Sequence, residues 1–341
     1  MARVTIKDVA QKAEVSITTV SRVLNDKVDE YMRKETKDRI LQAIKELNFK
    51  PDKRAQSLRG LRTKIIGLVI PNRLNPYFEQ LAAAVEQVCY KEGYGVLLCS
   101  SQNSIERESV YLDLLERQKV DAIILSTVGL KKGELNDLIE RGTPIVLVDE
   151  NVPGVNTPAI FANNYMGGCQ ATQYLIDLGH RRIAFITGSM NLLSSKDRLR
   201  GFCETLKKND LEPDRKLIKE GDYTYESGYE AGKQLLRKSR DDFTAIFCSD
   251  DLMAFGVIQA IRKKGMKVPD DYSIVGFDDM YFSSISSPQL TTVAQPVKEM
   301  AFRAFVAVKE QISEGLFQEK KHQFLDTQLI VRESSRPLEK W

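Results

Sequence analysis

The sequence contains few histidines and cysteines, and this scarcity narrows the chemistry that the protein can perform. Two of its 341 residues are histidine and five are cysteine, and no two cysteines form a CxxC pair. Zinc sites depend largely on histidine and cysteine ligands, so we expect no metal centre. Scattered cysteines in odd number are typical of a reducing compartment, where disulfides do not persist. We therefore predict a cytoplasmic protein without metal.

Long apolar runs and the common catalytic motifs are also missing. No stretch approaches the roughly eighteen apolar residues that a membrane-spanning helix requires, and the first residues do not form a signal-peptide pattern. The chain has no phosphate-binding glycine loop and neither the GxSxG nor the HExxH pattern of hydrolases. These absences argue against a membrane protein and against an enzyme, and we expect no cofactor.

Charge is unevenly distributed along the chain. Residues 1–64 contain 16 lysines and arginines against 9 acidic residues, a net charge of +7. The remaining residues contain 34 against 38, a net charge of −4. A small basic head on a mildly acidic body indicates an anionic polymer as the partner of the head.

Two short amphipathic helices are expected at the start of the head, within residues 4–25, because apolar residues recur there at helical spacing. Thr5 stands three residues before Asp8, the spacing of a capping box, and Ser16 is placed to cap the second helix. A short helix with hydroxyls and an arginine on its polar face suits the major groove of DNA. An ordinary helical hairpin with a solvated polar face is the alternative. The polar face of the second helix carries Ile17, Thr18, Ser21 and Arg22.

A third helix is expected from about residue 34 to residue 48, with Phe49 completing a three-helix core. The basic segment 52–60 that follows is too short to be a stable helix alone in water. If it becomes ordered against DNA, Ala55 and Leu58 would share one side, as an apolar wedge in the minor groove requires. A flexible basic linker is the alternative.

From residue 64 onward, short apolar strand patterns alternate with helical patterns, which predicts parallel sheets covered by helices on both faces. We predict two tandem α/β lobes, each with a parallel, doubly wound sheet, that face each other across a ligand cleft. Ligands of open parallel sheets bind at the carboxyl ends of the strands. The expected strands are 65–70, 95–99, 122–126, 145–148, 183–187, 245–248 and 273–276, and the expected helices are 76–92, 105–118, 134–141, 167–178, 198–209, 227–237 and 251–264.

Polar and aromatic side chains follow the predicted strands, so we expect them to line this cleft. Carboxylates and amides hydrogen-bond pairs of hydroxyls, a guanidinium donates in a planar fork, and aromatic rings stack on C–H faces. These groups suit a polyol or a sugar. The candidate effector-binding residues are Asn75, Tyr77, Phe78, Asp149, Arg198 (expected to open a helix), Tyr223, Asp250, Asp278 and Gln295.

Some of these residues have a plainer interpretation. Asp250 and Asp278 are also placed to cap the elements that follow them. Tyr77 and Phe78 also suit a core or a dimer face, and we assign Asp251 to capping rather than to binding. Their joint position at the ends of strands favours the cleft.

The head and the segment after it resemble the lactose-repressor (LacI) family of bacterial transcription regulators. The resemblance is carried by VTIKDVAQKAEVSITTVSRVLN at residues 4–25 and by RAQSL at residues 54–58, and it continues through nearly the whole chain. It implies that Ile17, Thr18 and Arg22 read bases in the major groove. It also implies hinge contacts with DNA by Arg54, Ala55 and Leu58, and contacts with the DNA backbone by Thr5, Ser16, Thr19, Ser21 and Asn25.

The resemblance implies three parts in the chain. A helix-turn-helix DNA-binding domain occupies residues 1–50, and a hinge helix or linker occupies residues 51–63. An effector-binding and dimerisation domain with a periplasmic-binding-protein-like fold occupies residues 64–341. Crossovers expected near 158–163, 287–292 and 323–329 assign about 64–161 and 291–322 to the first lobe, and about 162–290 and 323–341 to the second.

We expect a repressor of a carbohydrate-utilisation operon that binds a pseudo-palindromic, double-stranded operator as a homodimer. No leucine heptad follows the last expected strand, which favours a dimer over a tetramer. A sugar or sugar derivative that closes the cleft would change the spacing of the hinge segments and thereby the affinity for operator. The alternatives are a regulator controlled mainly by a partner phosphoprotein and a sugar-processing enzyme fused to a DNA-binding head.

Several positions depart from the family pattern. Glu14 occupies a turn position where glycine is usual, and a positive φ there would cost a glutamate about 1 kcal/mol. The loop 27–33 is longer than usual, and Arg33 replaces the usual serine before the third helix, so that helix lacks the cap that a serine would supply. Glu150 stands where many sugar-binding relatives have arginine, which leaves the identity of the effector open.

Overall fold

The chain folds into two compact units, Met1–Thr63 and Lys64–Trp341, in the computed structural model. The structure describes residues 4–24, 32–49, 62–237, 242–314 and 322–338. The expected hinge helix at residues 51–63 therefore lies almost entirely outside the described residues.

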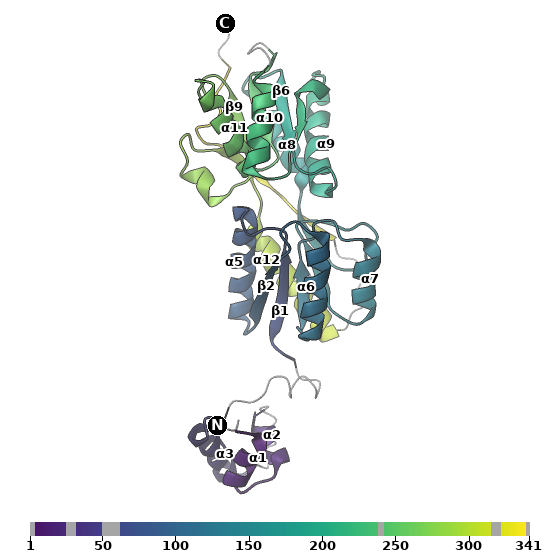
Figure 1. Ribbon diagram of the computed structural model, residues 1–341, viewed down its shortest axis with the longest axis vertical. Helices are drawn as coiled ribbons and strands as arrows, with labels where there is room; N and C mark the ends of the chain where they lie inside the picture. Colours follow the sequence, from purple (N-terminus) through teal and green to yellow (C-terminus); the bar gives the residue numbers. More distant parts are fainter. Residues whose placement is uncertain (1–3, 25–31, 50–61, 238–241, 315–321, 339–341) are drawn as a thin grey trace. The chain divides into compact units, whose positions relative to one another are not determined.

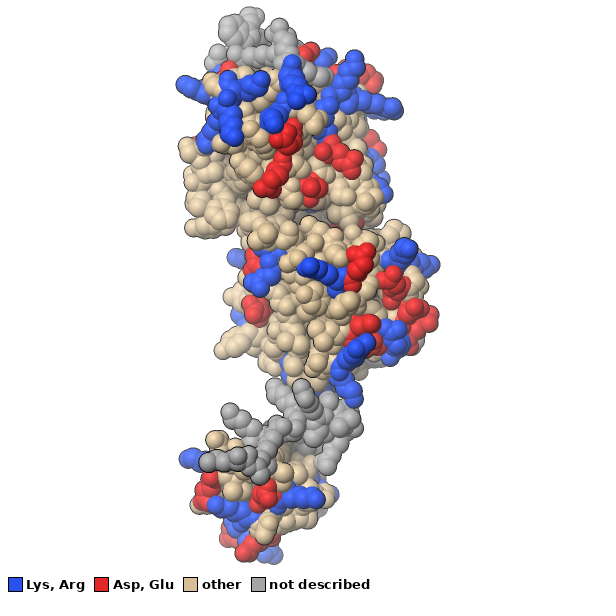
Figure 2. Space-filling model, viewed as in Figure 1, with Lys and Arg blue, Asp and Glu red and all other residues tan. Residues whose placement is uncertain are grey.

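The head contains three helices, α1 at Ile6–Lys12, α2 at Ile17–Leu24 and α3 at Lys34–Glu46 (Figure 1). Their apolar stripes meet in one small core, and Phe49 contributes to it as the sequence predicts. Figure 2 shows acidic as well as basic side chains on the visible face of this unit, so charge alone does not define a DNA-binding face. The fully buried or nearly buried residues of this core are Val9, Ala10, Ala13, Val20, Val23, Ile40, Ala43 and Phe49.

Side-chain caps fix the beginnings of the first two helices. The Asp8 carboxylate accepts hydrogen bonds from the Thr5 backbone N–H at 2.7 Å and from the Thr5 hydroxyl at 2.8 Å, and these bonds lower the pKa of Asp8. The Ser16 Oγ accepts from the Thr19 N–H at 3.1 Å. Both predicted caps are confirmed. Arg33 stands at the N-cap of α3 without a side-chain capping bond, so this helix begins without the cap that a serine would provide.

The turn between α1 and α2 contains a strained residue. Glu14 has a φ of 54°, in the left-handed region that L side chains disfavour. Glycine adopts this conformation without steric cost, so glutamate destabilises the turn by about 1 kcal/mol relative to glycine. The condition under which glutamate carries this cost is therefore met.

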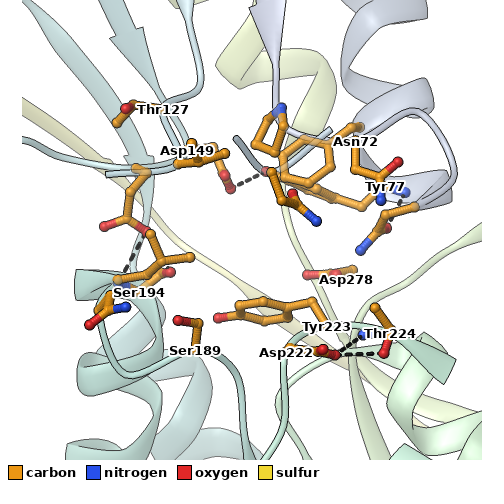
Figure 3. A pocket seen from close by; sticks show the side chains of 18 of the residues that line it. Asn72, Tyr77, Thr127, Asp149, Ser189, Ser194, Asp222, Tyr223, Thr224 and Asp278 are labelled. Carbon is orange, nitrogen blue, oxygen red and sulfur yellow. Dashed lines mark hydrogen bonds between the residues drawn. The ribbon is translucent and has the colours of Figure 1, made fainter. Parts of the chain in front are cut away.

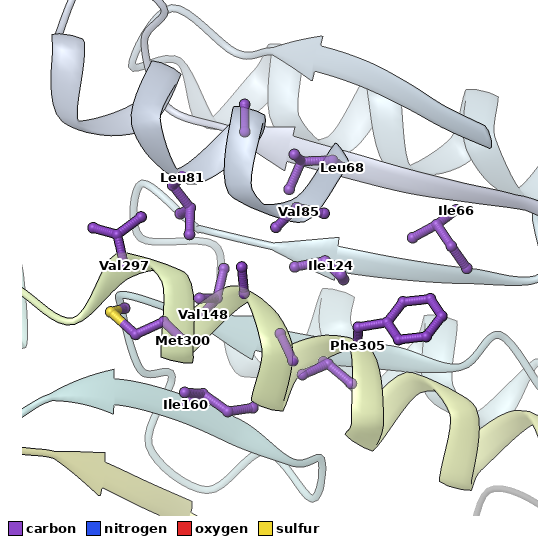
Figure 4. Close-up of a cluster of buried hydrophobic side chains, with 14 of the residues drawn as sticks. Ile66, Leu68, Leu81, Val85, Ile124, Val148, Ile160, Val297, Met300 and Phe305 are labelled. Carbon is purple, nitrogen blue, oxygen red and sulfur yellow. The ribbon is translucent and has the colours of Figure 1, made fainter. Parts of the chain in front are cut away.

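The first lobe of the body is a six-stranded parallel sheet with the order β11-β5-β4-β3-β1-β2. Helices α5 (Pro76–Lys91) and α12 (Val297–Glu314) cover one face, whose buried side chains appear in Figure 4. Helices α6 (Ile105–Arg117) and α7 (Lys132–Glu140) cover the other face. The strands are β1 at Ile65–Ile70, β2 at Gly95–Ser100, β3 at Ala122–Leu125, β4 at Ile145–Val148, β5 at Ala159–Ala162 and β11 at His322–Leu325.

The second lobe repeats this architecture, with the strand order β12-β10-β9-β8-β6-β7. β10 and β12 pair antiparallel, and the other described pairs of this sheet are parallel. Helices α8 (Asn164–Asp177) and α9 (Leu193–Lys208) pack on one face, and α10 (Tyr225–Leu235) and α11 (Asp251–Lys263) on the other. The predicted fold class is thereby confirmed. The strands are β6 at Ile183–Thr187, β7 at Ile218–Glu220, β8 at Ala245–Cys248, β9 at Ser273–Asp278, β10 at Thr291–Ala294 and β12 at Gln328–Ile330, with short 3-10 helices η1 at Arg215–Leu217 and η3 at Tyr281–Ser284.

The chain passes between the lobes after β5, after β10 and after β11 (Figure 1). Because β10 pairs with β9, residues 291–294 belong to the second sheet rather than to the first lobe, where the sequence analysis put them. Because β11 pairs with β5, residues 323–325 belong to the first sheet rather than to the second. The sequence pattern does not change before β10 or β11, so the lobe to which each strand belongs is known only from the strand with which it pairs.

Glycines let the helices of the second lobe approach closely. A Cβ on Gly201 of α9 would lie 2.3 Å from the Tyr165 carbonyl oxygen of α8, and one on Gly168 would lie 2.5 Å from the Arg198 carbonyl oxygen. Side chains at these positions would collide with backbone, which cannot rotate away. The contact therefore fixes α9, and with it Arg198, against α8.

No helix in the described part of the chain is long and apolar enough to span a bilayer. Nor do the described residues include a group of three His, Cys, Asp or Glu side chains arranged to hold a metal ion. The five cysteines form no disulfide.

Candidate functional site

Helix α2 turns its predicted base-reading residues away from the core of the head. Ile17 is 38% exposed, and Thr18 and Arg22 are exposed as well, whereas Val20 and Val23 on the opposite side are buried. An exposed isoleucine beside polar side chains suits contact with base edges and thymine methyl groups. The predicted roles of these residues remain predictions.

The residues expected to contact the DNA backbone lie around the beginnings of α1 and α2. Thr5 and Ser16 are exposed at the N-caps of the two helices, where unpaired backbone N–H groups favour phosphate. Thr19 and Ser21 are partly buried on α2. The remaining expected DNA contacts, Asn25, Arg54, Ala55 and Leu58, lie outside the described residues.

A cavity of about 400 Å³ lies among the strand ends of the body (Figure 3). This volume is within the usual range of small-molecule sites. Side chains of both lobes form its wall, so a ligand in it would contact both lobes at once. Eight of the nine predicted effector residues line it: Asn75, Tyr77, Phe78, Asp149, Arg198, Tyr223, Asp278 and Gln295.

Tyr77 and Asp149 form the wall that belongs to the first lobe. The Tyr77 hydroxyl donates to one carboxylate oxygen of Asp149 at 2.7 Å, and the Ser126 hydroxyl donates to the other at 3.1 Å. Burial raises the pKa of Asp149, and the hydrogen bond from Tyr77 opposes this rise. Asn75 caps α5 by accepting from the Tyr77 N–H at 3.0 Å. The ring of Phe78 meets that of Tyr77 edge-on at 5.1 Å, and both residues line the cavity.

Arg198 and Asp278 form the wall that belongs to the second lobe. The Arg198 side chain is buried; it donates to Asn164 Oδ1 at 2.8 Å and lies 3.7 Å from an Asp278 carboxylate oxygen. Its guanidinium carbon stands 3.7 Å from the centre of the Phe277 ring. Burial raises the pKa of Asp278 well above its ordinary range, against the attraction of Arg198. Gln295 donates to Asp278 at 2.7 Å.

Arg198 does not open its helix, as the sequence analysis expected. Helix α9 begins at Leu193, so Arg198 lies within the helix. The residues before it, LSSKD, are mostly polar and show no apolar stripe, so periodicity could not reveal the first turn. Arg198 nevertheless faces the cavity.

Three residues of the cavity have a left-handed backbone. Asp149, Tyr223 and Asp278 have φ angles of 71°, 65° and 107°, which cost free energy for residues other than glycine. Such strain is typical of binding and active sites, where the surrounding structure holds it in place. Tyr223 is held by a 2.5 Å hydrogen bond between its hydroxyl and that of Ser195.

Glu150 reaches across the cleft from the end of β4 to the start of α9. Its carboxylate accepts from the Leu193 N–H at 2.8 Å, from the Ser194 hydroxyl at 2.6 Å and from the Ser194 N–H at 3.4 Å. Figure 3 shows the bond to Ser194 at one side of the cavity. The residue is 4% exposed, and burial raises its pKa to about 7 against the hydrogen bond from Ser194.

Asp250, the ninth predicted residue, is not part of the cavity wall. One of its carboxylate oxygens caps α11 by accepting from the Met253 N–H at 2.8 Å. The other accepts from the Asn75 side-chain amide at 3.3 Å. The N-cap geometry turns the carboxylate back onto its own helix. Asp250 therefore links the lobes beside the cavity instead of lining it.

Asp251, which the sequence analysis assigned to capping, has a different task. Its carboxylate accepts from the Met280 N–H at 2.8 Å and from the hydroxyls of Ser283 and Thr292 at 2.6 and 2.5 Å. It thus holds the segment after β9. The assignment was wrong because the neighbouring Asp250 already supplies the cap.

Some lining residues follow the same strand ends but are not among the residues predicted from the sequence. Asn72 comes shortly after β1, and Ser189 and Asn191 come shortly after β6, so extending each candidate loop by a few residues would have found them. Residues that contact each other across the cleft, such as Glu150 and Ser194, show no pattern in the local sequence that would predict the contact. The lining residues that were not selected are Pro71, Asn72, Asn103, Ile105, Thr127, Val128, Glu150, Ser189, Asn191, Leu192, Ser194, Asp222 and Thr224.

Two protein-family models match parts of the chain. "Bacterial regulatory proteins, lacI family" matches residues 5–52, and "Periplasmic binding protein-like domain" matches residues 172–335. The HTH-type transcriptional repressor PurR of Histophilus somni (strain 129Pt) is 37% identical over 98% of this chain and 99% of its own length. The chain belongs to the LacI family.

Solved structures of LacI-family regulators have the same fold. The transcriptional regulator CelR in complex with cellobiose is 31% identical, with a TM-score of 0.72 over 97% of this chain and all of that one. The lac repressor dimer bound to operator and the anti-inducer ONPF is 26% identical, with a TM-score of 0.86 over 98% of this chain and all of that one. This LacI-family protein is a DNA-binding transcriptional repressor and not an enzyme, and its partners are operator DNA and a small-molecule effector.

Proposed function

We propose that this LacI-family protein represses genes of carbohydrate use, and that an uncharged sugar or sugar derivative in the cavity controls its affinity for operator. One observation carries the proposal. Asp149, Asp278 and Gln295 present hydrogen-bonding groups beside the rings of Tyr77 and Phe78 around one small cavity. Hydroxyl pairs bind such acceptors and C–H faces pack on such rings.

The similar regulator CelR was solved as its cellobiose complex, which supports a sugar as the class of effector. A sugar of one or two rings also fits a cavity of about 400 Å³.

The position of the cavity supports allosteric control. A ligand that hydrogen-bonds Asp149 of the first lobe and Asp278 of the second gains both contacts only when the lobes are close. It therefore favours the closed arrangement by the difference between its affinities for the two states. Operator binding must change the affinity for the effector by the same factor, because the coupling is reciprocal.

We further propose that the protein binds a pseudo-palindromic operator as a homodimer, one head on each half-site. Ile17, Thr18 and Arg22 would read bases, because α2 exposes them on the face away from the core. The lac repressor, whose structure is similar, was solved as a dimer on operator.

A thermal-shift screen of the full chain against neutral sugars, sugar acids and nucleobases tests the proposed effector class. We expect a neutral sugar to stabilise the protein, and Arg198→Ala and Asp278→Asn to abolish that stabilisation. Arg200→Ala is the matched control, because Arg200 lies exposed on the same helix and pairs with Asp197 instead. A nucleobase that stabilises the protein when no sugar does would overturn the sugar assignment.

Binding of operator by Arg22→Ala at fixed salt tests the proposed reading helix. We expect a loss of about 1–3 kcal/mol in specific binding, with a smaller loss on unrelated DNA. Arg39→Ala removes an equal charge from the exposed side of α3 and should affect both kinds of DNA alike. Unchanged specific affinity in Arg22→Ala would remove α2 from the reading role.

A further inference from the structure

The wall of the cavity contains more acidic than basic side chains. Asp149, Glu150, Asp222 and Asp278 line it, and Arg198 is the one basic residue among its described lining residues. The guanidinium of Arg198 is already engaged, because it donates to Asn164 and to the Ser249 carbonyl and lies beside Asp278. A charged group of the effector would therefore have to find its partners elsewhere in the wall.

The beginning of α9 is the part of the wall best suited to a negative group. The N–H groups of Leu193 and Ser194 and the Ser194 hydroxyl converge there on one point. Unpaired N–H groups in the first turn of a long helix attract phosphates and carboxylates. That point is occupied by the carboxylate of Glu150, which belongs to the other lobe and is almost fully buried.

We propose that Glu150 determines the charge specificity of the effector site. Its carboxylate fills the position at α9 where a phosphate or carboxylate of a ligand would bind, so the site accepts uncharged effectors and rejects their anionic analogues. The proposal rests on the proposed function only in taking this cavity as the effector site.

Two physical effects exclude an anion from this position. A ligand phosphate would have to displace a side chain that makes three hydrogen bonds to α9. If it bound beside that side chain in its ionised form, two like charges would share one site that is shielded from water. Truncating the Glu150 side chain should reverse both effects, because it frees the donors of α9 and removes the like charge.

A role restricted to joining the lobes predicts a different outcome. If Glu150 only linked the lobes, Glu150→Ala would lower the melting temperature and gain no ligand. Under the proposal, Glu150→Ala gains an anion-binding site. Glu150→Gln does not, because the amide still fills the position and its oxygen can accept from α9.

Inorganic phosphate is the probe, titrated calorimetrically into the full-length protein at constant ionic strength. We expect the wild type to show no saturable binding of phosphate in the titrated range. Glu150→Ala should bind phosphate with a Kd at least tenfold below the upper end of that range. Glu220→Ala is the matched control: Glu220 also accepts from a backbone N–H before α9, that of Met190, but does not line the cavity. Glu150→Ser serves as a second variant if the alanine variant does not fold.

Equal phosphate affinity in the wild type and in the folded truncation variant, Glu150→Ala or Glu150→Ser, would overturn the proposal, as would an equal gain in Glu220→Ala. The assay does not depend on the natural effector, so its outcome is separable from the sugar screen. If Glu150→Ala gains phosphate while no sugar stabilises the wild type, the sugar assignment fails and the role of Glu150 stands. If a sugar stabilises the wild type but Glu150→Ala does not gain phosphate binding, the sugar assignment stands and the proposed role of Glu150 fails.

Discussion

Glu14, Asp149, Tyr223 and Asp278 share a backbone conformation that their side chains disfavour. The last three surround the cavity, where hydrogen bonds to neighbouring side chains hold them. Glu14 is different, because it is exposed in the turn of the head. Its strain is therefore the easiest of the four to relieve by substitution.

Replacing Glu14 by glycine should stabilise the head by up to about 1 kcal/mol, because glycine adopts a positive φ without a steric penalty. Hydrogen exchange of the α1 and α2 amides in the full-length protein should slow by up to about fivefold. Glu35→Gly in the first turn of α3 is the control. It should accelerate exchange, because glycine destabilises a helix by about 1 kcal/mol relative to better helix formers. Faster exchange in Glu14→Gly would contradict the strain argument.

Glu108 is a second buried acid whose charge matters for the cavity. From α6 it accepts from the Thr127 hydroxyl at 2.5 Å and from the Val128 N–H at 2.8 Å. Thr127 and Val128 both line the cavity, so Glu108 positions one of its loops. Burial raises the pKa of Glu108 from an ordinary value of 4.5 to about 7, against the hydrogen bonds from these residues.

A raised pKa means that the folded protein resists ionisation of Glu108. The free energy of unfolding should therefore fall as pH rises from about 4.5 through about 7. Glu108→Gln mimics the protonated form and should lose this part of the pH dependence. Above about pH 7, its free energy of unfolding should exceed that of the wild type by up to about 3 kcal/mol. Urea unfolding at several pH values measures the difference, and an unchanged slope in Glu108→Gln would refute it. Glu106→Gln, exposed on the same helix, is the control.

Among the helices and strands, those with a continuous apolar pattern were predicted best. The bounds predicted for β1, β4, β6 and β8 are correct, because buried parallel strands form continuous, mostly apolar runs. The first turn of α9 is polar and was not predicted, and neither was α12. The contact of Glu150 with Ser194 could not be predicted, because it depends on how the two lobes meet, which local patterns do not encode.

The close contact of α8 and α9 depends on glycine. Gly201→Ala should destabilise the protein by about 2–3 kcal/mol, because a Cβ there would lie 2.3 Å from the Tyr165 carbonyl oxygen. Gly133→Ala in α7 is the control. A Cβ there meets nothing within 4 Å, so helix propensity should make it neutral or stabilising by up to about 1 kcal/mol. Urea unfolding of both variants checks the pair, and equal stabilities would disprove the packing argument.

For the body as a whole, Met280 adds an apolar contact between the two lobes to the polar links made by Glu150 and Asp250. Met280 follows β9 of the second lobe, but it is 1% exposed and belongs to the buried apolar cluster of the first lobe, which also contains Met300 and Ala301 of α12. Asp251 holds its backbone N–H from the second lobe. The two lobes thus share part of one apolar core.

Met280→Ala should cost about 2–5 kcal/mol, as truncation of a buried methionine generally does. Because the lost contact joins the lobes, we also expect a larger radius of gyration in X-ray scattering of the effector-free protein. Met166→Ala on the 42% exposed side chain of α8 is the control, and should change neither quantity. An unchanged radius in a destabilised Met280→Ala protein would assign the residue to packing alone.

The three chain passages between the lobes also decide which parts of the protein can be exchanged. A graft of one lobe would need three junctions and a new partner for Met280, whereas the head joins the body through a single segment between residues 49 and 64. A designer of hybrid regulators should therefore be able to replace residues 1–63 and keep the response to the effector. The head can be exchanged at a single junction, whereas the two lobes of the body have to be transferred together.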